Sequence, residues 1–420
     1  MDTATAVKSL LSPQAGVDPY PAYAAIRAAG PVLAMGGSFF VSGWDAADRI
    51  LRDPGMQAYD SGLLDQQWTD WRTNRAVSLF ADSMLRQNPP NHTRMRRLAS
   101  GVFTARRVGE LRAVIEGQVD DLLDGLGGTE VDLMSDLAYP LPIAVITALL
   151  GVPAADRRMF RRLAEALTAV LEVRFTQEQA ATAHTAALEL EEYLTALVEQ
   201  RRRAPENDLV SALAAAHDAG GDRLTADELL GNLALLLVAG FETTTNLLGN
   251  AIVLLLDHPE QAKRLVADPA LAPAYVEEVL RVDSPVQLTE RFASRDVRIG
   301  AVDIPTGAEL IVLLGAANRD PQRFAEPDRF VPDRPGNAPL SFGAGAHYCL
   351  GAPLARLEAQ VALPALLRRF PDLELAGRPV RRERLTLRGW AALPVRPGSV
   401  DWARSSAKER SSANKGSATA

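Results

Sequence analysis

The stretch Ser341-Phe342-Gly343-Ala344-Gly345-Ala346-His347-Tyr348-Cys349-Leu350-Gly351 lies near the C-terminus and contains the only cysteine of the 420-residue chain. A single cysteine cannot form an internal disulfide, so Cys349 is an inert small hydrophobe, a nucleophile or a metal ligand. Three glycines surround it, and glycine permits positive φ angles and a close approach of a flat, bulky partner to the backbone.

A helix is expected directly after the cysteine, over 352–369, because this segment is rich in Ala, Leu, Arg and Glu. Pro353 falls in its first turn, where helices tolerate proline. Cys349 would then face free N–H groups and the positive end of the helix dipole, which favours the thiolate. A thiolate in a crowded, glycine-lined loop is suited to binding iron.

The loop resembles the haem-ligand loop of the cytochrome P450 family, whose pattern is Phe-Gly-x-Gly-x-His-x-Cys-x-Gly. Every fixed position is matched, by Phe342, Gly343, Gly345, His347, Cys349 and Gly351. The resemblance implies a haem b cofactor with Cys349 as its axial thiolate. The alternative is a buried structural cysteine in a glycine-rich turn.

Composition indicates a globular protein without a disulfide framework, since 47% of residues are hydrophobic and 23% are charged. The net charge of −7 argues against nucleic acid as a partner. Residues 1–19 lack the features of a secretion signal, and no apolar run approaches the roughly 20 residues that span a bilayer. We therefore expect a cytoplasmic protein that binds neither nucleic acid nor membranes.

The apolar pattern predicts a mainly α fold with a minor β portion. We expect a single domain over 1–402 and a disordered tail over 403–420, which has no large apolar residue. Helices are predicted over 108–126, 134–150, 154–171, 176–203, 225–257 and 272–282. A hairpin is predicted at Val32–Met35 and Ser38–Val41, and short strands at 297–299 and 309–313. The resemblance implies the cytochrome P450 fold, with haem between a long central helix and the cysteine loop with its C-terminal helix.

The helix predicted over 225–257 has an unusual middle. Thr225 and Glu228 form a capping-box pattern at its start, and about 48 Å of helix would cross the whole molecule. The middle reads Ala239-Gly240-Phe241-Glu242-Thr243-Thr244-Thr245, where glycine, threonines and an acid oppose local propensity within an apolar stretch. Local rules broken together at one place indicate function.

This segment resembles the oxygen-activation motif of the same family. The resemblance implies that Ala239 and Gly240 form a groove for dioxygen over the iron. It also implies that Thr243 hydrogen-bonds the bound oxygen and that Glu242 relays protons from solvent. The alternative is a kinked core helix with a solvated glutamate.

Glu278 and Arg281 are three residues apart, so they share one face of the helix predicted over 272–282. The later stretch Pro327-Asp328-Arg329-Phe330 resembles the meander region of the family. By that resemblance Arg329 joins Glu278 and Arg281 in a buried charge network behind the haem. We expect a structural role for all three.

Haem propionates are carboxylates and need cationic or hydrogen-bonding partners. The resemblance assigns this role to His92, Arg96, Arg291 and His347. His92 and Arg96 are four residues apart, so one helix can present both to the same ligand.

The substrate pocket is expected beneath the long aromatic segment 59–85, because long irregular loops often cover binding sites. The predicted pocket residues are Trp68, Trp71 and Phe80 from this segment, Val286, Gln287, Leu288 and Thr289 after the 272–282 helix, and Trp390. For Trp390, plain core packing is a nearly equal alternative.

These motifs predict a haem-thiolate monooxygenase that takes O2 and two electrons and hydroxylates or epoxidises a small organic substrate. Arg- and Ala-rich members of the family often tailor polyketides, terpenoids or peptides, so we expect a step of secondary metabolism. The chain has no cysteine cluster and no Gly-x-Gly-x-x-Gly unit. Electrons are therefore expected from a separate ferredoxin and its ferredoxin reductase, and the protein is expected to be a monomer.

A basic cluster offers the electron donor a candidate docking surface, because complementary charge raises association rates. Its members are Arg94, Arg96, Arg97, Arg106 and Arg107. The alternative is a solvated face. Three other functions stay open: a peroxide-driven haem-thiolate enzyme, a non-catalytic haem-binding protein and a cysteine-nucleophile enzyme. The Glu242-Thr243 pair favours the monooxygenase over the first two.

Overall fold

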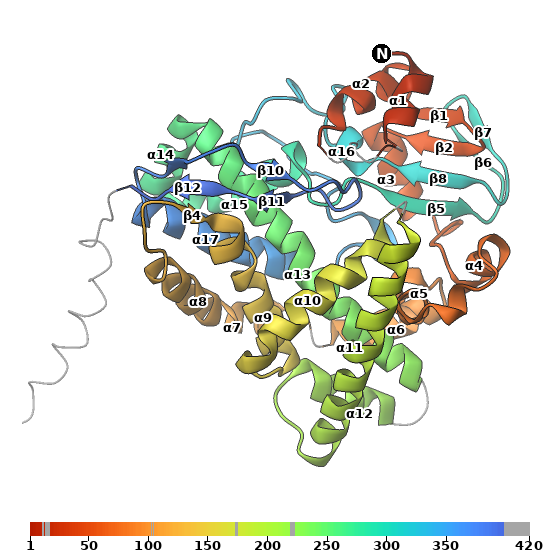
Figure 1. The fold of residues 1–420 in the computed structure, drawn as a ribbon. Coiled ribbons are helices and arrows are strands. Elements are labelled where there is room, and N and C mark those ends of the chain that lie inside the picture. The colour runs from red at the N-terminus through yellow and green to blue at the C-terminus, as the bar shows by residue number, and fades with distance from the viewer. Residues whose placement is uncertain are drawn as a thin grey trace, which may run out of the picture.

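The computed structural model describes residues 1–10, 12, 17–101, 103, 105–172, 175–218 and 223–398. The predicted tail, 403–420, lies outside the described residues. Helices fill the centre and lower part of the molecule, and the strands gather in its upper part (Figure 1). This agrees with the predicted mainly α fold.

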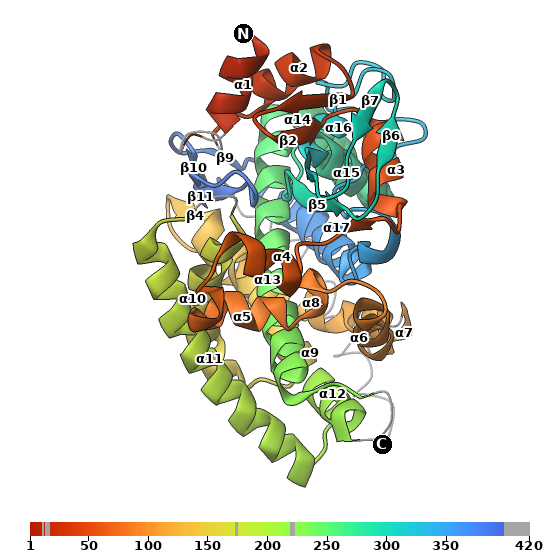
Figure 2. The same ribbon diagram turned by 90° about the vertical axis from the view of Figure 1, so that its right-hand side faces the viewer.

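Helix α13, Ala226–Asp257, runs through the middle of the molecule (Figure 2). The predicted capping box closes its first turn: Glu228 N–H donates to Thr225 Oγ1 at 3.2 Å, and Thr225 N–H donates to Glu228 Oε2 at 2.8 Å. Most of its side chains are buried on all sides, as a central helix requires. The predicted central helix is therefore confirmed to within one residue.

The remaining helices surround α13. Those before it are α1 (Thr3–Leu10), α2 (Tyr20–Ala28), α3 (Trp44–Arg52), α4 (Ser61–Gln67), η2 (Trp71–Thr73), α5 (Arg75–Ala81), η3 (Met84–Arg86), α6 (Asn91–Ser100), α7 (Ala105–Glu110), α8 (Arg112–Asp124), η4 (Met134–Ala138), α9 (Pro140–Leu150), η5 (Ala154–Asp156), α10 (Arg157–Leu167), η6 (Thr168–Leu171), α11 (Gln177–Arg203) and α12 (Leu209–Asp218). Those after it are α14 (Pro259–Ala267), η7 (Pro269–Leu271), α15 (Ala272–Val282), α16 (Leu314–Ala317), η8 (Gly345–His347) and α17 (Ala352–Arg369).

Three predicted helices are interrupted. The one over 108–126 divides into α7 and α8, and the one over 154–171 begins and ends in the 3-10 turns η5 and η6. The one over 134–150 begins as the π-helical turn η4 before α9 starts at Pro140. Proline is common in the first turn of a helix, because an N–H group there would have no intrahelical acceptor and its absence costs nothing. Pro140 therefore starts a new helix. The helices predicted over 176–203 and 272–282 are confirmed as α11 and α15.

A five-stranded sheet has the order β1-β2-β8-β5-β3. Its strands are β1 (Val32–Met35), β2 (Ser38–Val41), β3 (Met56–Gln57), β5 (Thr289–Ala293) and β8 (Glu309–Val312). β1 and β2 form the predicted hairpin, with Met35 opposite Ser38. β8 joins β2 in parallel and β5 in antiparallel pairing, which brings β5, with Arg291, into the sheet.

Three smaller sheets complete the β portion. They pair β6 (Val297–Ile299) with β7 (Val302–Ile304), β10 (Val380–Arg381) with β11 (Trp390–Ala392), and β12 (Pro394–Arg396) with both β4 (Val131–Asp132) and β9 (Glu374–Leu375). The strand predicted over 297–299 is thereby confirmed.

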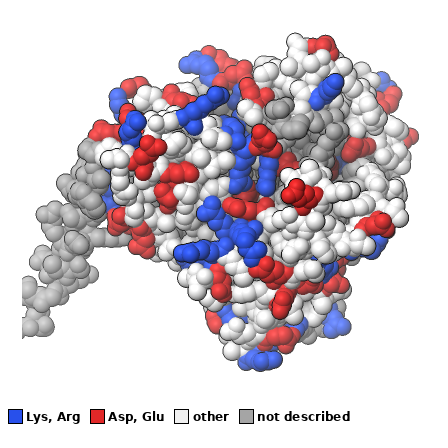
Figure 3. Space-filling model, in the orientation of Figure 1, with Lys and Arg blue, Asp and Glu red and all other residues white. Residues whose placement is uncertain are grey.

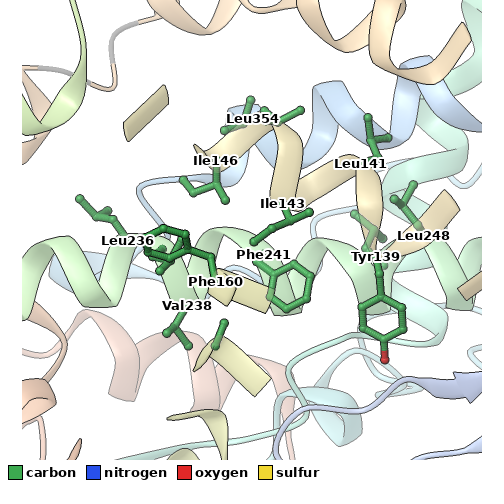
Figure 4. Close-up of a cluster of buried hydrophobic side chains, with 14 of the residues drawn as sticks. Tyr139, Leu141, Ile143, Ile146, Phe160, Leu236, Val238, Phe241, Leu248 and Leu354 are labelled. Carbon is green, nitrogen blue, oxygen red and sulfur yellow. The ribbon is translucent and has the colours of Figure 1, made fainter. Parts of the chain in front are cut away.

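The largest apolar core surrounds α13, and Figure 4 shows part of it. Phe241 of α13 points toward Ile143 of α9, and its ring centroid lies 5.9 Å from that of Tyr139. A Cβ atom on Gly240 would lie 2.7 Å from Cδ1 of Ile146. Glycine at this position therefore lets α9 cross α13 closely. Among the described residues, no helix combines the length and apolar character needed to span a membrane.

Candidate active site

The cysteine loop leads directly into α17, as predicted. Gly343 and Gly345 have φ angles of +68° and +67°, which favour glycine. A side chain at Gly345 would also overlap the backbone of Leu51. Cys349 N–H donates to the carbonyl oxygen of Phe342 at 2.9 Å, which closes the loop around the sulfur.

The Cys349 sulfur faces a cavity inside the protein. Burial raises the pKa of the Cys349 thiol, while the N–H groups of Gly351 and Ala352 and the Arg96 guanidinium act to lower it. These donors stabilise a negative sulfur, and coordination to a metal cation would remove its proton.

The cavity has a volume of about 420 Å³ and lies between the cysteine loop and α13. Most of its exposed lining is apolar, as in sites for small organic ligands. The predicted residues that line it are His92, Arg96, Ala239, Gly240, Glu242, Thr243, Val286, Leu288, Thr289, Arg291, Phe342, Gly343, His347, Cys349 and Gly351. Segments from both halves of the chain therefore meet at one site.

On the α13 side, Ala239 is exposed to the cavity although it lies in the middle of a central helix. The Thr243 hydroxyl donates to the carbonyl oxygen of Ala239 at 2.9 Å, one turn back. This bond holds the hydroxyl at the cavity wall, where its oxygen can still accept a hydrogen bond.

Glu242 is fully buried, so it is not the solvated glutamate of the alternative interpretation. Its Oε1 forms an ion pair with Arg382, and Arg384 Nη1 lies 3.9 Å away. Burial raises the pKa of Glu242 to about 7, with Arg384 acting to lower it. Arg382 also donates to the hydroxyl of Tyr139, which Figure 4 shows pointing away from the apolar cluster.

One face of the molecule carries mixed charge (Figure 3). Figure 3 shows basic side chains gathered over α10 and beside β10 and β11, with acidic side chains among them. Arg384, which follows β10, donates to Thr168 Oγ1 of η6 at 2.6 Å. Sequence reasoning missed Arg382 and Arg384 because only the tertiary fold brings this segment to α13.

Four cationic or basic side chains meet on another wall of the cavity: His92, Arg96, Arg291 and His347. The rings of His92 and His347 have centroids 4.0 Å apart. Burial, together with the neighbouring Arg96 and Arg291, lowers the pKa of His92 to about 4 and that of His347 to about 3. Burial also lowers the pKa of Arg291 to about 10.

Among the described residues, the two arginines of this group donate hydrogen bonds only to uncharged oxygens. Arg291 donates to Thr289 Oγ1 at 3.2 Å and to the Glu290 carbonyl at 2.7 Å, and Arg96 donates to the Tyr348 carbonyl at 2.6 Å. Within the described part of the chain, neither arginine forms an ion pair with a carboxylate. Arg291 is buried, and a buried cation without a counter-ion is costly, so the site is built for an anionic ligand, and the propionates of haem fit it.

The predicted charge network needs one correction. Arg281 Nη2 donates to Glu278 Oε1 at 2.8 Å, and both side chains are buried. Arg329 contributes only its carbonyl oxygen, which accepts from Arg281 at 2.8 Å, while its side chain is 67% exposed and pairs with Glu326. The third charged member is Arg334, whose Nε lies 3.2 Å from Glu278 Oε1. A turn at 326–329 directs Arg329 to solvent and brings Arg334 back to the carboxylate.

Five predicted pocket residues do not line the cavity. Trp71 and Phe80 are buried in the main core, and the Trp68 ring lies 6.0 Å from that of Phe175. Gln287 donates to the Ser284 carbonyl at 2.7 Å. Trp390 packs beneath Arg381, whose guanidinium carbon is 3.4 Å from the ring centroid, which agrees with the core-packing alternative. Large aromatic side chains gain more from core burial than from lining an open cavity.

Tyr59, Arg86 and Glu290 also line the cavity, and sequence reasoning missed all three. The available signal was a charged residue, Arg86, only six positions before His92 in an otherwise apolar turn.

Known proteins resemble this chain over most of its length. The sequence model of the Cytochrome P450 family matches residues 38–388. The cytochrome P450 monooxygenase PikC of Streptomyces venezuelae is 41% identical over 396 residues, which cover 90% of this chain and 91% of PikC. The 6-deoxyerythronolide B hydroxylase of Saccharopolyspora erythraea is 40% identical, with 93% and 99% covered. The crystal structure of CYP164A2 from Mycobacterium smegmatis superposes with a TM-score of 0.86 at 41% identity, covering 93% of this chain and 99% of that one.

Proposed function

This chain belongs to the cytochrome P450 family, and we propose that Cys349 is the axial thiolate through which it holds haem b and oxygenates a small organic substrate. Its enzyme class is that of a haem monooxygenase, like its relatives. The proposal rests on one cavity in which Cys349, the 239–243 segment of α13 and four cationic or basic side chains meet.

Bound haem supplies the redox-active iron that activates O2, and a thiolate ligand favours cleavage of the O–O bond. His92, Arg96, Arg291 and His347 would hold the propionates. Phe342, Gly343 and Gly351 would lie against the flat ring, where the absence of side chains on both glycines leaves room for it.

Glu242 and Thr243 would move protons to the reaction site. With a pKa near neutrality, the Glu242 carboxyl can both hold and release a proton. The Arg382 guanidinium keeps it oriented and links it to the charged surface. The Thr243 hydroxyl donates to the Ala239 carbonyl and stays at the cavity wall. There it would position the group that receives the proton.

Relatives support a tailoring step in secondary metabolism. One is named for hydroxylating 6-deoxyerythronolide B, and a solved neighbour, the monooxygenase TamI, is bound to tirandamycin C, with a TM-score of 0.82 and 37% identity. The mostly apolar cavity of this chain would accept a ligand of similar apolar character.

Enzymes of this family receive electrons from a redox partner, and we assign that role here to a ferredoxin with its reductase. Docking would take place beside α6 and the exposed ring of Tyr348, next to Cys349. Arg94 and Arg106 pair with Glu228 and Glu110, and the basic cluster as a whole lies close to this surface. A monomeric state and a cytoplasmic location stay predictions.

The absorption spectrum of the reduced, carbon-monoxide-bound protein tests the proposal. Thiolate ligation is expected to place the Soret band at the long wavelength typical of the family, and Cys349→His should move it to the position of an imidazole-bound globin. A wild-type band at the globin position would overturn the proposal. Turnover by hydrogen peroxide that exceeds turnover with a ferredoxin system would instead favour the peroxide-driven alternative.

A further inference from the structure

Arg86 lines the cavity, but it has no part in the haem binding or the proton transfer proposed above. It ends the short turn η3, which is anchored to α13 because Met84 N–H donates to Asn232 Oδ1 at 3.1 Å. Its Nη1 atom is buried without a hydrogen-bond partner. Within the described residues its guanidinium forms no ion pair. A desolvated, unpaired guanidinium is costly, so this position calls for an anion.

The residues around Arg86 hold its side chain in place, but none of those described forms an ion pair with its guanidinium. Its guanidinium carbon lies 5.1 Å from the centroid of the Tyr59 ring, within the range of a cation–π contact. The Tyr59 ring stacks on Phe292 with centroids 5.2 Å apart, and its hydroxyl donates to Gln67 Oε1 at 2.7 Å. Tyr59 is therefore a fixed platform for Arg86.

Glu290 is the acidic group that acts on Arg86, but the two side chains form no ion pair. It lies on β5, where ladder hydrogen bonds hold its backbone, and among the described residues its carboxylate forms no ion pair with the guanidinium. Burial raises the pKa of Glu290, while Arg86 acts to lower it. Because Glu290 forms no ion pair with Arg86, the guanidinium N–H groups can donate to a ligand in the cavity.

Arg86 lies on η3, whereas His92 and Arg96 of the propionate-binding group lie on the next helix, α6. Glu290 lies near both Arg86 and Arg291, and it acts to raise the pKa of each guanidinium.

We propose that Arg86 binds a carboxylate of the substrate, so that this enzyme selects apolar molecules that carry one acidic group. The proposal rests on the haem-monooxygenase function above and adds the substrate class. The planar guanidinium suits a carboxylate because it can donate two parallel hydrogen bonds to it. Met84 and Leu85 beside it, with Leu235 and Val238 of α13, form apolar walls for the rest of the ligand.

Ligands anchored at the iron test the proposal without knowledge of the substrate. The probes are straight-chain alkanoic acids with an N-linked imidazole at the far end, in a series of increasing chain length, together with their methyl esters and the plain alkylimidazoles. Affinity is read from the Soret shift when imidazole binds the ferric haem. At the chain length that reaches Arg86, the acid should bind at least about tenfold tighter than its ester.

Substitution of Arg86 tests whether this residue causes the preference for the acid over its ester. Arg86→Gln should abolish the acid-over-ester ratio, and Arg86→Lys should keep part of it, because a charge remains but the planar pair of donors is lost. Glu290→Gln removes a like charge and should leave the ratio unchanged or raise it. The control is Arg52→Gln on α3, whose side chain is 61% exposed, and it should behave as wild type.

Several results would overturn the proposal. One is an acid-over-ester ratio near one at every chain length in the wild type, and another is the same ratio in wild type and Arg86→Gln. Faster haem transfer from Arg86→Gln to apomyoglobin, with equal weakening of acids and esters, would show instead that Arg86 holds a propionate. No Soret shift with the plain alkylimidazoles would count against the haem site itself.

Discussion

Glu242, buried in the middle of α13, forms an ion pair with Arg382, which follows strand β10 near the other end of the chain. Arg382 also donates to the Tyr139 hydroxyl at the start of α9. The acid of the central helix is thus tied to two distant segments, one of which reaches the surface. Such a contact restricts the rotamers of Glu242 and connects it to solvent.

Glu242→Gln should lower the turnover rate by about a hundredfold, because the variant has no carboxyl to donate a proton. The wild type should also depend on pH. Burial raises the pKa of Glu242 to about 7, so the proton-holding form dominates below that pH and is lost above it. Product formation should therefore fall as pH rises through about 7, whereas the variant should be flat over this range.

The measurement is the rate of product formation across pH, with a reconstituted electron-transfer system and NADPH consumption recorded alongside. Glu189→Gln on α11 is the control, since its side chain is 40% exposed and pairs with Arg162. A variant with the rate and pH profile of the wild type would contradict a proton-relay role for Glu242.

Thr243→Ala should divert electrons into hydrogen peroxide while the rate of NADPH consumption changes little. The reason is that the hydroxyl at the cavity wall, held by Ala239, would be missing where protons are delivered. Peroxide and product are measured together. Thr182→Ala, which removes an equivalent i−4 hydroxyl bond on the exposed face of α11, should leave coupling unchanged; unchanged coupling in Thr243→Ala as well would refute this role.

Arg334→Ala should destabilise the protein far more than Arg329→Ala. Removing Arg334 leaves part of the buried Glu278 charge uncompensated, which costs up to about 3–5 kcal/mol of the free energy of unfolding. Arg329→Ala removes an exposed pair with Glu326 worth at most about 1 kcal/mol.

Urea unfolding of the two variants measures this difference, with haem content recorded for each. Glu278→Gln should behave like Arg334→Ala or worse and prevent haem incorporation. Equal losses for Arg329→Ala and Arg334→Ala would contradict the network as the structure places it.

Arg291→Gln should weaken haem retention, because the buried guanidinium is the proposed partner of a propionate. Loss of one charge-assisted hydrogen bond predicts haem release about tenfold faster, measured as transfer to apomyoglobin. Arg298→Gln on β6, where the side chain is 68% exposed, is the matched control. Equal release rates for the two variants would remove Arg291 from the proposed propionate site.

Local signals in the sequence predicted much of the scaffold. The capping box at Thr225 and Glu228 and the apolar run after it set the start and length of α13, since both act within one or two helical turns. The Gly36-Gly37 turn set the β1–β2 hairpin in the same way. A predicted helix boundary was wrong where a local signal was overlooked, as at Pro140, which begins α9.

The sequence by itself determined the chemistry of the loop around Cys349 and the broken helix rules at Gly240, Glu242 and Thr243, because both depend on residues adjacent in the chain. Only the tertiary structure decided the long-range partners: Arg382 for Glu242, and Arg334 rather than Arg329 for Glu278. It also left Arg86 in the cavity without an ion pair to any described residue. It also placed Trp71, Phe80 and Trp390 in the core. The physical reason is that desolvation and ion pairing depend on distances between segments remote in sequence, which no local pattern specifies.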